Sequence, residues 1–162
     1  MPFQPRDRAI LRDLAREIAE AAAQPVMAER RDMWRRHNRL ERVRPMVLVF
    51  PEGSWRELLP QSVLLCEDER ARDIERHLRL RLYYRDHIPD DSVIERDWIV
   101  PKAITTTGWG LEPRRIPSTQ AEGAWAFDPV IGQPADLGKL RFPEVRHDEA
   151  ATAQRLAEMQ DL

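Results

Sequence analysis

The sequence predicts an α/β protein, because patterns typical of amphipathic helices lie on both sides of a short apolar strand. In the range 5–22, apolar residues recur every four positions and would share one face of a helix. The range 46–50, Met-Val-Leu-Val-Phe, is a continuous apolar run between Pro45 and Pro51. Such a run is typical of a strand buried on both faces, as in a parallel sheet. A second helical pattern occupies 68–85, so the predicted order is helix, strand, helix.

A further helix is predicted over 25–39, with Pro25 at its first position, where a missing N–H costs nothing. Seven arginines lie between Arg30 and Arg44. They could bind phosphate or nucleic acid, or they could form a solvated helix face with packed aliphatic stems. The net charge of −2 argues against a general nucleic-acid binder, so we expect no nucleic-acid partner.

After the strand, the pattern predicts a short helix near 55–59 and then the helix 68–85, which has acidic residues at its N-terminus, where the helix dipole favours them. The range 92–107 is expected to be extended, as two short strands interrupted by Pro101. The range 108–134 is rich in glycine and proline and is expected to be irregular. A last helix is expected over 148–160.

The length of 162 residues fits a single domain. We divide it into an N-terminal helical segment, the first strand with its helix, an extended Pro/Gly-rich insertion, and a linker with the C-terminal helix. These parts cover 1–44, 45–91, 92–134 and 135–162.

The single cysteine, Cys66, excludes an internal disulfide and indicates a reducing compartment. The N-terminal residues lack the apolar core of a signal peptide, and no apolar run approaches the roughly 20 residues of a membrane span. We therefore expect a cytoplasmic protein without a membrane partner.

No complete catalytic or metal-binding motif is present. None of the four histidines has metal-ligand spacing, and one cysteine cannot provide a CxxC pair. A site made of His77, His87 and Asp86 is conceivable, but solvated positions at the end of a charged helix explain these residues as well. Cys66 lies among leucines, which favours a small buried side chain over a nucleophile. No metal or cofactor is expected.

Glu52 is the most notable single candidate, because it follows the predicted strand 46–50 after a single residue, Pro51. Ligands collect at the C-terminal ends of strands in α/β sheets. Together with Gly53 and Trp55, Glu52 could therefore bind a substrate. An equally good interpretation is that Glu52 caps the turn or the helix that follows.

Several segments resemble the uroporphyrinogen decarboxylase-like family, and in particular an uncharacterised branch of it. The first is Met27-Ala-Glu-Arg-Arg-Asp-Met-Trp-Arg-Arg-His-Asn, followed by Val43-Arg-Pro45 and the strand 46–50. The others are Pro51-Glu-Gly-Ser-Trp55, Thr106-Thr-Gly-Trp-Gly-Leu111 and the linker-like range 127–143. Their order and spacing carry the resemblance over most of the chain.

The resemblance implies a partial (β/α)8 TIM barrel, an N-terminal portion with no activity of its own. Full-length relatives would be decarboxylase-like lyases or methyltransferases. The decarboxylases carry Arg-Gln-Ala-Gly-Arg after the first strand to hold substrate carboxylates, where this chain has Pro51-Glu-Gly-Ser-Trp55. Since Glu52 would repel a propionate, the resemblance does not extend to porphyrinogen decarboxylation. The partners expected are a second copy or a complementing C-terminal chain.

An alternative is a free-standing small binding or scaffold domain that self-associates or pairs with another chain. That alternative predicts a closed core with all five tryptophans buried.

Overall fold

The computed structural model describes residues 3–119 and 123–162 and divides the chain into two compact units. Unit 1 runs up to Ile99 and also contains Glu158–Leu162, and unit 2 is Val100–Ala157. The boundary after Ile99 lies inside the range 92–134, which the sequence grouped as one insertion.

The helices predicted for unit 1 are confirmed. They are α1 (Pro5–Ala22), α2 (Pro25–Asn38) and α4 (Glu69–His87). Proline begins both α1 and α2, and the Asp68 carboxylate caps α4 by accepting from the Ala71 N–H at 3.0 Å. Short helices η1 (Glu52–Ser54), α3 (Trp55–Leu58) and η2 (Gln61–Val63) lie between α2 and α4.

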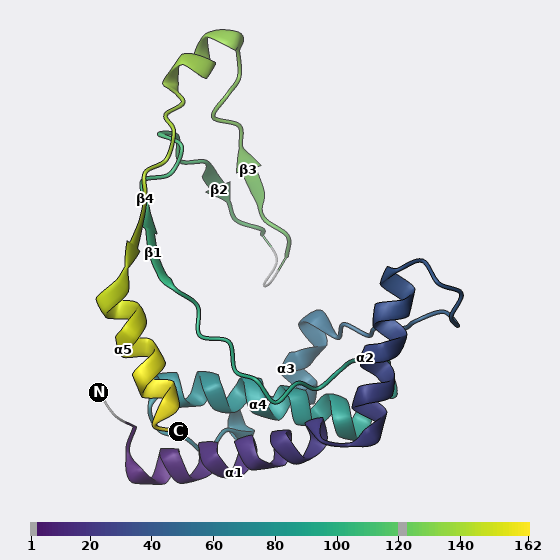
Figure 1. Ribbon diagram of the computed structural model, residues 1–162. Coiled ribbons are helices and arrows are strands. Elements are labelled where there is room, and N and C mark those ends of the chain that lie inside the picture. Colours follow the sequence, from purple (N-terminus) through teal and green to yellow (C-terminus); the bar gives the residue numbers. More distant parts are fainter. Residues whose placement is uncertain (1–2, 120–122) are drawn as a thin grey trace. The chain divides into compact units, whose positions relative to one another are not determined.

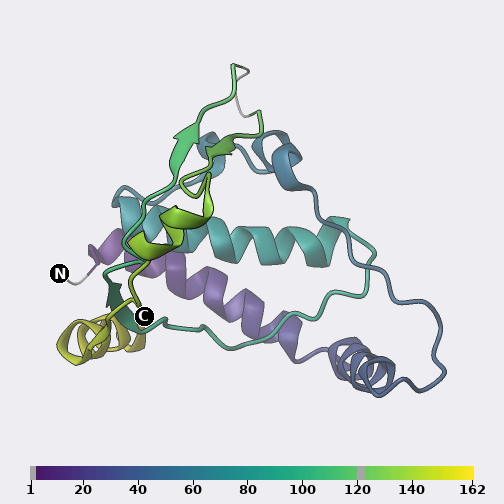
Figure 2. The ribbon, with the colours of Figure 1, turned by 90° about the horizontal axis from the view of Figure 1, so that it is seen from above.

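The core of unit 1 forms where α1 packs along α4, and the two helices lie side by side in both ribbon views (Figure 1, Figure 2). The spacing-of-four stripe predicted for α1 is the face that becomes buried, since Leu11, Leu14 and Ile18 all lie in the core. Facing them are the buried residues Ala71, Ile74, Leu78 and Leu82 of α4.

Two buried carboxylates fix the segment that leads into α4. Asp7 of α1 accepts hydrogen bonds from the backbone N–H groups of Glu67 and Asp68 at 3.0 Å each. Glu75 of α4 is fully buried and accepts from the N–H groups of Leu65 and Cys66 at 2.9 and 2.8 Å. These bonds satisfy backbone donors that would otherwise be buried without a partner.

The range 46–50 is not the doubly buried strand that the sequence predicted. No strand is assigned there, and Val47 and Phe50 are 52% and 71% exposed. An apolar run becomes a buried strand only if neighbouring strands pair with it, and the described residues contain no such strand. Side chains from the C-terminal end of α4 and the loop after it bond to the segment instead.

Unit 2 contains two small antiparallel sheets. In one, β1 (Ala103–Thr106) pairs with β4 (Val145–Asp148), with Ala103 opposite Asp148. In the other, β2 (Arg114–Ile116) pairs with β3 (Ala126–Asp128). Only β1 of the two strands predicted over 92–107 is formed. The range expected to be irregular contains β2 and β3, because an antiparallel pair needs only short runs and local partners.

Short polar contacts organise the rest of unit 2. The turn after β1 uses Gly108 and Gly110 at φ of 69° and 79°, a backbone region that favours glycine. In η3 (Pro134–Lys139), the Asp136 carboxylate accepts from the N–H groups of Gly132 and Gln133 and from Lys139. The predicted last helix is confirmed as α5 (Glu149–Gln160).

The chain is thus a mixed α/β protein. Its described strands form two-stranded antiparallel sheets, and residues 3–119 and 123–162 contain no closed barrel and no parallel sheet. None of the described helices is long and apolar enough to span a bilayer.

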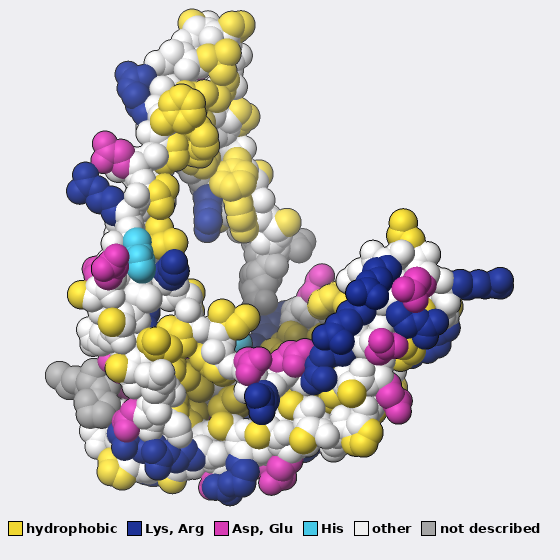
Figure 3. All heavy atoms as spheres, viewed as in Figure 1, with side chains coloured by type: hydrophobic (Ala, Val, Ile, Leu, Met, Phe, Trp, Pro, Cys, Tyr) yellow, Lys and Arg dark blue, Asp and Glu magenta, His cyan; other side chains and the backbone are white. Residues whose placement is uncertain are grey.

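Aromatic side chains remain open to solvent. Trp98, Trp109 and Trp125 are 36%, 55% and 47% exposed. Figure 3 shows apolar side chains gathered on the visible face of unit 2. The five buried tryptophans required by the free-standing domain are therefore not found.

Candidate functional site

The candidate site is the extended segment 46–50 together with residues 51–55 that follow it. One edge of this segment is closed by hydrogen bonds. The Val47 N–H donates to the Asp91 carboxylate at 2.8 Å, and the Val47 carbonyl accepts from the Asp91 N–H at 2.9 Å. Two residues on, the Val49 N–H donates to Asp90 at 3.0 Å, and the Val49 carbonyl accepts from the Tyr84 hydroxyl at 2.7 Å. A spacing of two on one side is the geometry of a strand.

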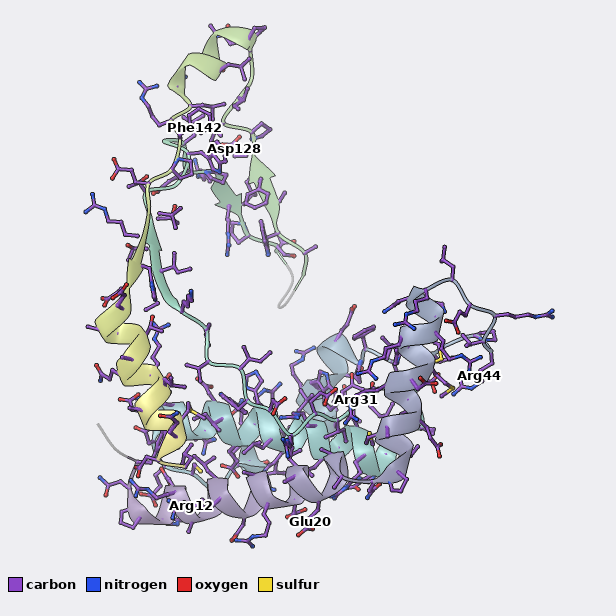
Figure 4. All side chains as sticks on the ribbon, viewed as in Figure 1. Arg12, Glu20, Arg31, Arg44, Asp128 and Phe142 are labelled. Carbon is purple, nitrogen blue, oxygen red and sulfur yellow. The ribbon has the colours of Figure 1, made fainter. Side chains whose placement is uncertain are left out.

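Asp91 is the central residue of this closed edge. Its buried carboxylate forms a forked pair with both terminal nitrogens of Arg44, one of them at 2.7 Å. The Arg44 hydrogen bond and the Val47 N–H together lower the pKa of Asp91 to about 2. Figure 4 labels Arg44 on the loop that follows α2. The run Pro89-Asp90-Asp91 has the composition of a turn, and no motif reveals that both carboxylates face a segment more than forty residues earlier.

The Asp91 carboxylate should make unfolding depend on pH. Because its pKa is lowered from 3.8 to about 2, its stabilisation is fully present above pH ~4 and is lost as the pH falls toward 2. We expect the difference in unfolding free energy between the parent and Asp91→Asn to be constant above pH ~4 and to shrink below it. Urea titrations of both proteins across this pH range would measure the difference in unfolding free energy. A difference that stays constant down to pH ~2 would contradict the prediction.

The three residues predicted to bind a substrate lie in different surroundings. Trp55 packs edge-on against Tyr83 and obliquely against Tyr84, each with ring centroids 5.5 Å apart. Glu52 is exposed, with φ of 47°, and its side chain makes no hydrogen bond or ion pair with the described residues. Gly53 is exposed, and an added Cβ would meet nothing within 4 Å. The structure therefore brings Trp55 to an aromatic cluster and leaves Glu52 free to meet a ligand or a partner.

The helix-capping interpretation of Glu52 finds no support in the contacts. Its side chain accepts no bond from the first turn of α3, and Ser54, the N-cap residue before that helix, makes no side-chain cap. The left-handed backbone of Glu52 is a conformation that disfavours residues with a Cβ.

Other candidate residues serve structural roles. Cys66 is buried as predicted, and burial, with the adjacent Glu75, raises the pKa of its thiol to about 12. A thiol of that pKa is a poor nucleophile at neutral pH. Along α4, His77 contacts Trp98 and the Asp73 carbonyl, whereas His87 stacks near Tyr83. Within the described residues, no three His, Cys, Asp or Glu side chains converge as a metal site.

The arginine-rich range 30–44 is partly neutralised. Arg30 donates to the Ser92 carbonyl at 2.8 Å, Arg31 pairs with Glu95 at 3.0 Å, and Arg36 pairs with Glu41 at 3.2 Å. With Arg44 bound to Asp91, four of the seven arginines make contacts within the chain, whereas Arg35, Arg39 and Arg42 are exposed.

Unit 1 also has an apolar cavity of about 140 Å³ between α1 and α4. Its lining includes Ile18, Leu78, Trp98 and Met159, with Arg81 at its wall. Burial lowers the pKa of Arg81, although the negative charges of Glu95 and Asp97 act to raise it.

Comparisons of the chain with protein-family models, with curated proteins and with solved structures find no match. The case for any function therefore rests on the residues and on their arrangement.

Proposed function

We propose that this chain is the N-terminal portion of a uroporphyrinogen decarboxylase-like protein of the decarboxylase and methyltransferase superfamily. In this proposal, the chain belongs to a cytoplasmic (β/α)8 barrel, segment 46–50 is its first strand, and the chain has no activity of its own. Residues Glu52, Gly53 and Trp55 then lie at the C-terminal end of that strand, where barrel enzymes bind substrates.

The observation that carries the proposal is the half-bonded state of segment 46–50. Val47 and Val49 have partners for their backbone groups, whereas Met46, Leu48 and Phe50 have none among the described residues. The side chains of Leu48 and Phe50 are also 43% and 71% exposed. A strand in this state needs a neighbouring strand, and further chain would supply one.

One other observation agrees with the proposal. The order of helix, helix, extended segment and helix matches the order of the resembling motifs.

The mass of the native protein in its source cells tests the proposal. A (β/α)8 barrel takes roughly 250 residues, so we expect the native chain to be clearly heavier than the 19.0 kDa of these 162 residues. Intact-mass spectrometry after immunopurification would measure it. A native mass of 19.0 kDa, without a complementing chain in stoichiometric complex, would overturn the proposal in favour of a free-standing domain.

A further inference from the structure

The apolar cavity of about 140 Å³ between α1 and α4 is lined only by residues of unit 1, and none of them belongs to the range 46–55. Ile18 of α1 and Leu78 of α4 contribute to its apolar wall, together with Trp98. Ala15 and Trp98 line the cavity and are exposed to solvent as well. The cavity therefore opens at the surface, and a ligand can enter it without unfolding the core.

Arg81 brings a positive charge to this apolar cavity. It follows Ile74 and Leu78 along α4 at the spacing of one helix face, so all three side chains line the cavity. Arg81 is half-buried, and its guanidinium makes no hydrogen bond or ion pair with the described residues. Desolvation lowers the pKa of Arg81, but an arginine still keeps its proton at neutral pH. The cavity thus holds a partly desolvated cation that no protein group contacts as a partner.

The two carboxylates that act on Arg81 through space are engaged by other arginines. Both oxygens of Glu95 accept from Arg31 Nε, at 3.0 and 3.2 Å. Asp97 lies 3.8 Å from Arg96, which is itself a residue of the cavity lining. The charged side chains that line the cavity are therefore both arginines, Arg81 and Arg96. This charge favours an anionic ligand over a neutral or a cationic one of the same shape.

We propose that the cavity binds a small carboxylic acid, with the carboxylate on Arg81 and an apolar group of about six carbon atoms inside. The size follows from the volume, because an apolar protein cavity of about 150 Å³ holds one benzene molecule. The carboxylate follows from Arg81, whose planar guanidinium can donate two parallel hydrogen bonds to the two oxygens. This site goes beyond the proposed function, since it shares no residue with the candidate site at Glu52.

An NMR titration of the 162-residue chain tests this site by following the indole N–H signal of Trp98, identified by its loss in Trp98→Phe. The probes are phenylacetate and phenylacetamide, which have the same shape and differ in charge. We expect phenylacetate to shift the Trp98 signal with a dissociation constant of about 10 µM to 1 mM, as suits a ligand of about ten non-hydrogen atoms. Phenylacetamide should bind about tenfold more weakly, because it cannot form the charged pair.

Arg81→Met should weaken phenylacetate binding about tenfold and leave phenylacetamide binding unchanged, because methionine keeps an apolar side chain at the wall but removes the charge. Arg35→Met is the matched control, since Arg35 is an exposed arginine of α2 outside the cavity, and it should change neither affinity. Circular dichroism of each variant would show that the helices are retained. The comparison of the two probes on the parent chain needs no variant, so it tests the charge requirement even if a variant fails to fold.

Ala15→Leu tests whether the ligand lies inside the cavity. Ala15 is an exposed residue of the lining, so a leucine there takes up part of the cavity without disturbing the buried core, and both probes should bind about tenfold more weakly. A Trp98 signal that does not move at about 10 mM phenylacetate would overturn the site. Equal affinities for the two probes, or full phenylacetate affinity in Arg81→Met or in Ala15→Leu, would also overturn it. None of these results bears on the native mass, so the proposed function is tested separately.

Discussion

Replacing Glu75 with glutamine is expected to lower the free energy of unfolding of unit 1 by about 3–5 kcal/mol. The Glu75 side chain is fully buried, and it binds two backbone N–H groups as well as Arg79 at 2.7 Å. Burial alone would raise the pKa of Glu75, but these bonds outweigh it and hold that pKa below its usual value. A glutamine has the same size but turns an NH2 group toward donors, which leaves at least one buried donor unpaired.

The loss is large relative to the roughly 5–15 kcal/mol that stabilises a typical domain. Urea unfolding followed by the helical circular dichroism signal would measure it. Glu20→Gln is the matched control, since Glu20 is an exposed residue of α1, labelled in Figure 4, and should change the stability by less than about 0.5 kcal/mol. Equal unfolding midpoints for the two variants would show that the carboxylate of Glu75 is dispensable.

The helices could be predicted because their signals are local. In α1, the spacing of Leu14 and Ile18 places both on one face, and Pro5 marks the start. The same reasoning located α2, α4 and α5 to within two residues. Helix formation depends on neighbours three and four positions away, which a single sequence displays directly.

The strands could not be predicted in the same way, because a strand is defined by a partner that is distant in sequence. The run 46–50 has the composition of a central strand, yet its backbone bonds to carboxylates of Asp90 and Asp91. Conversely, β4 carries the polar residues Arg146, His147 and Asp148, and it becomes a strand because β1 lies beside it. Its composition gives no such signal.

In the candidate site, too, some residues could be identified from local sequence and others could not. Glu52 and Trp55 could be identified because they lie within five residues of the end of an apolar run, which is a local feature. The residues that hold the run, Tyr84, Asp90 and Asp91, come from the C-terminal end of α4 and the loop after it. These residues hold the run only because the fold places the C-terminal end of α4 beside segment 46–50, and the sequence does not display this proximity.

Replacing Asp91 with asparagine should therefore loosen segment 46–50 while the α1–α4 core stays folded. The Asp91 carboxylate accepts hydrogen bonds from Arg44 and from the Val47 N–H at the same time. The amide of asparagine has one acceptor oxygen and no negative charge, so it cannot replace both of these charge-assisted bonds. We expect a loss of about 2–3 kcal/mol, since hydrogen bonds to charged groups contribute roughly 1.5–3 kcal/mol each and some of the geometry survives. Hydrogen exchange should speed up at the Val47 amide, whereas buried amides of α4 should keep their protection.

Asp97→Asn is the control for this variant, because Asp97 is an exposed carboxylate whose contact with Arg96 is 3.8 Å long. It should leave both stability and exchange at Val47 unchanged. Unchanged exchange at Val47 in Asp91→Asn would show that the closed edge does not depend on this carboxylate. The closed edge holds the segment extended, and only an extended segment presents Met46, Leu48 and Phe50 together on the other side.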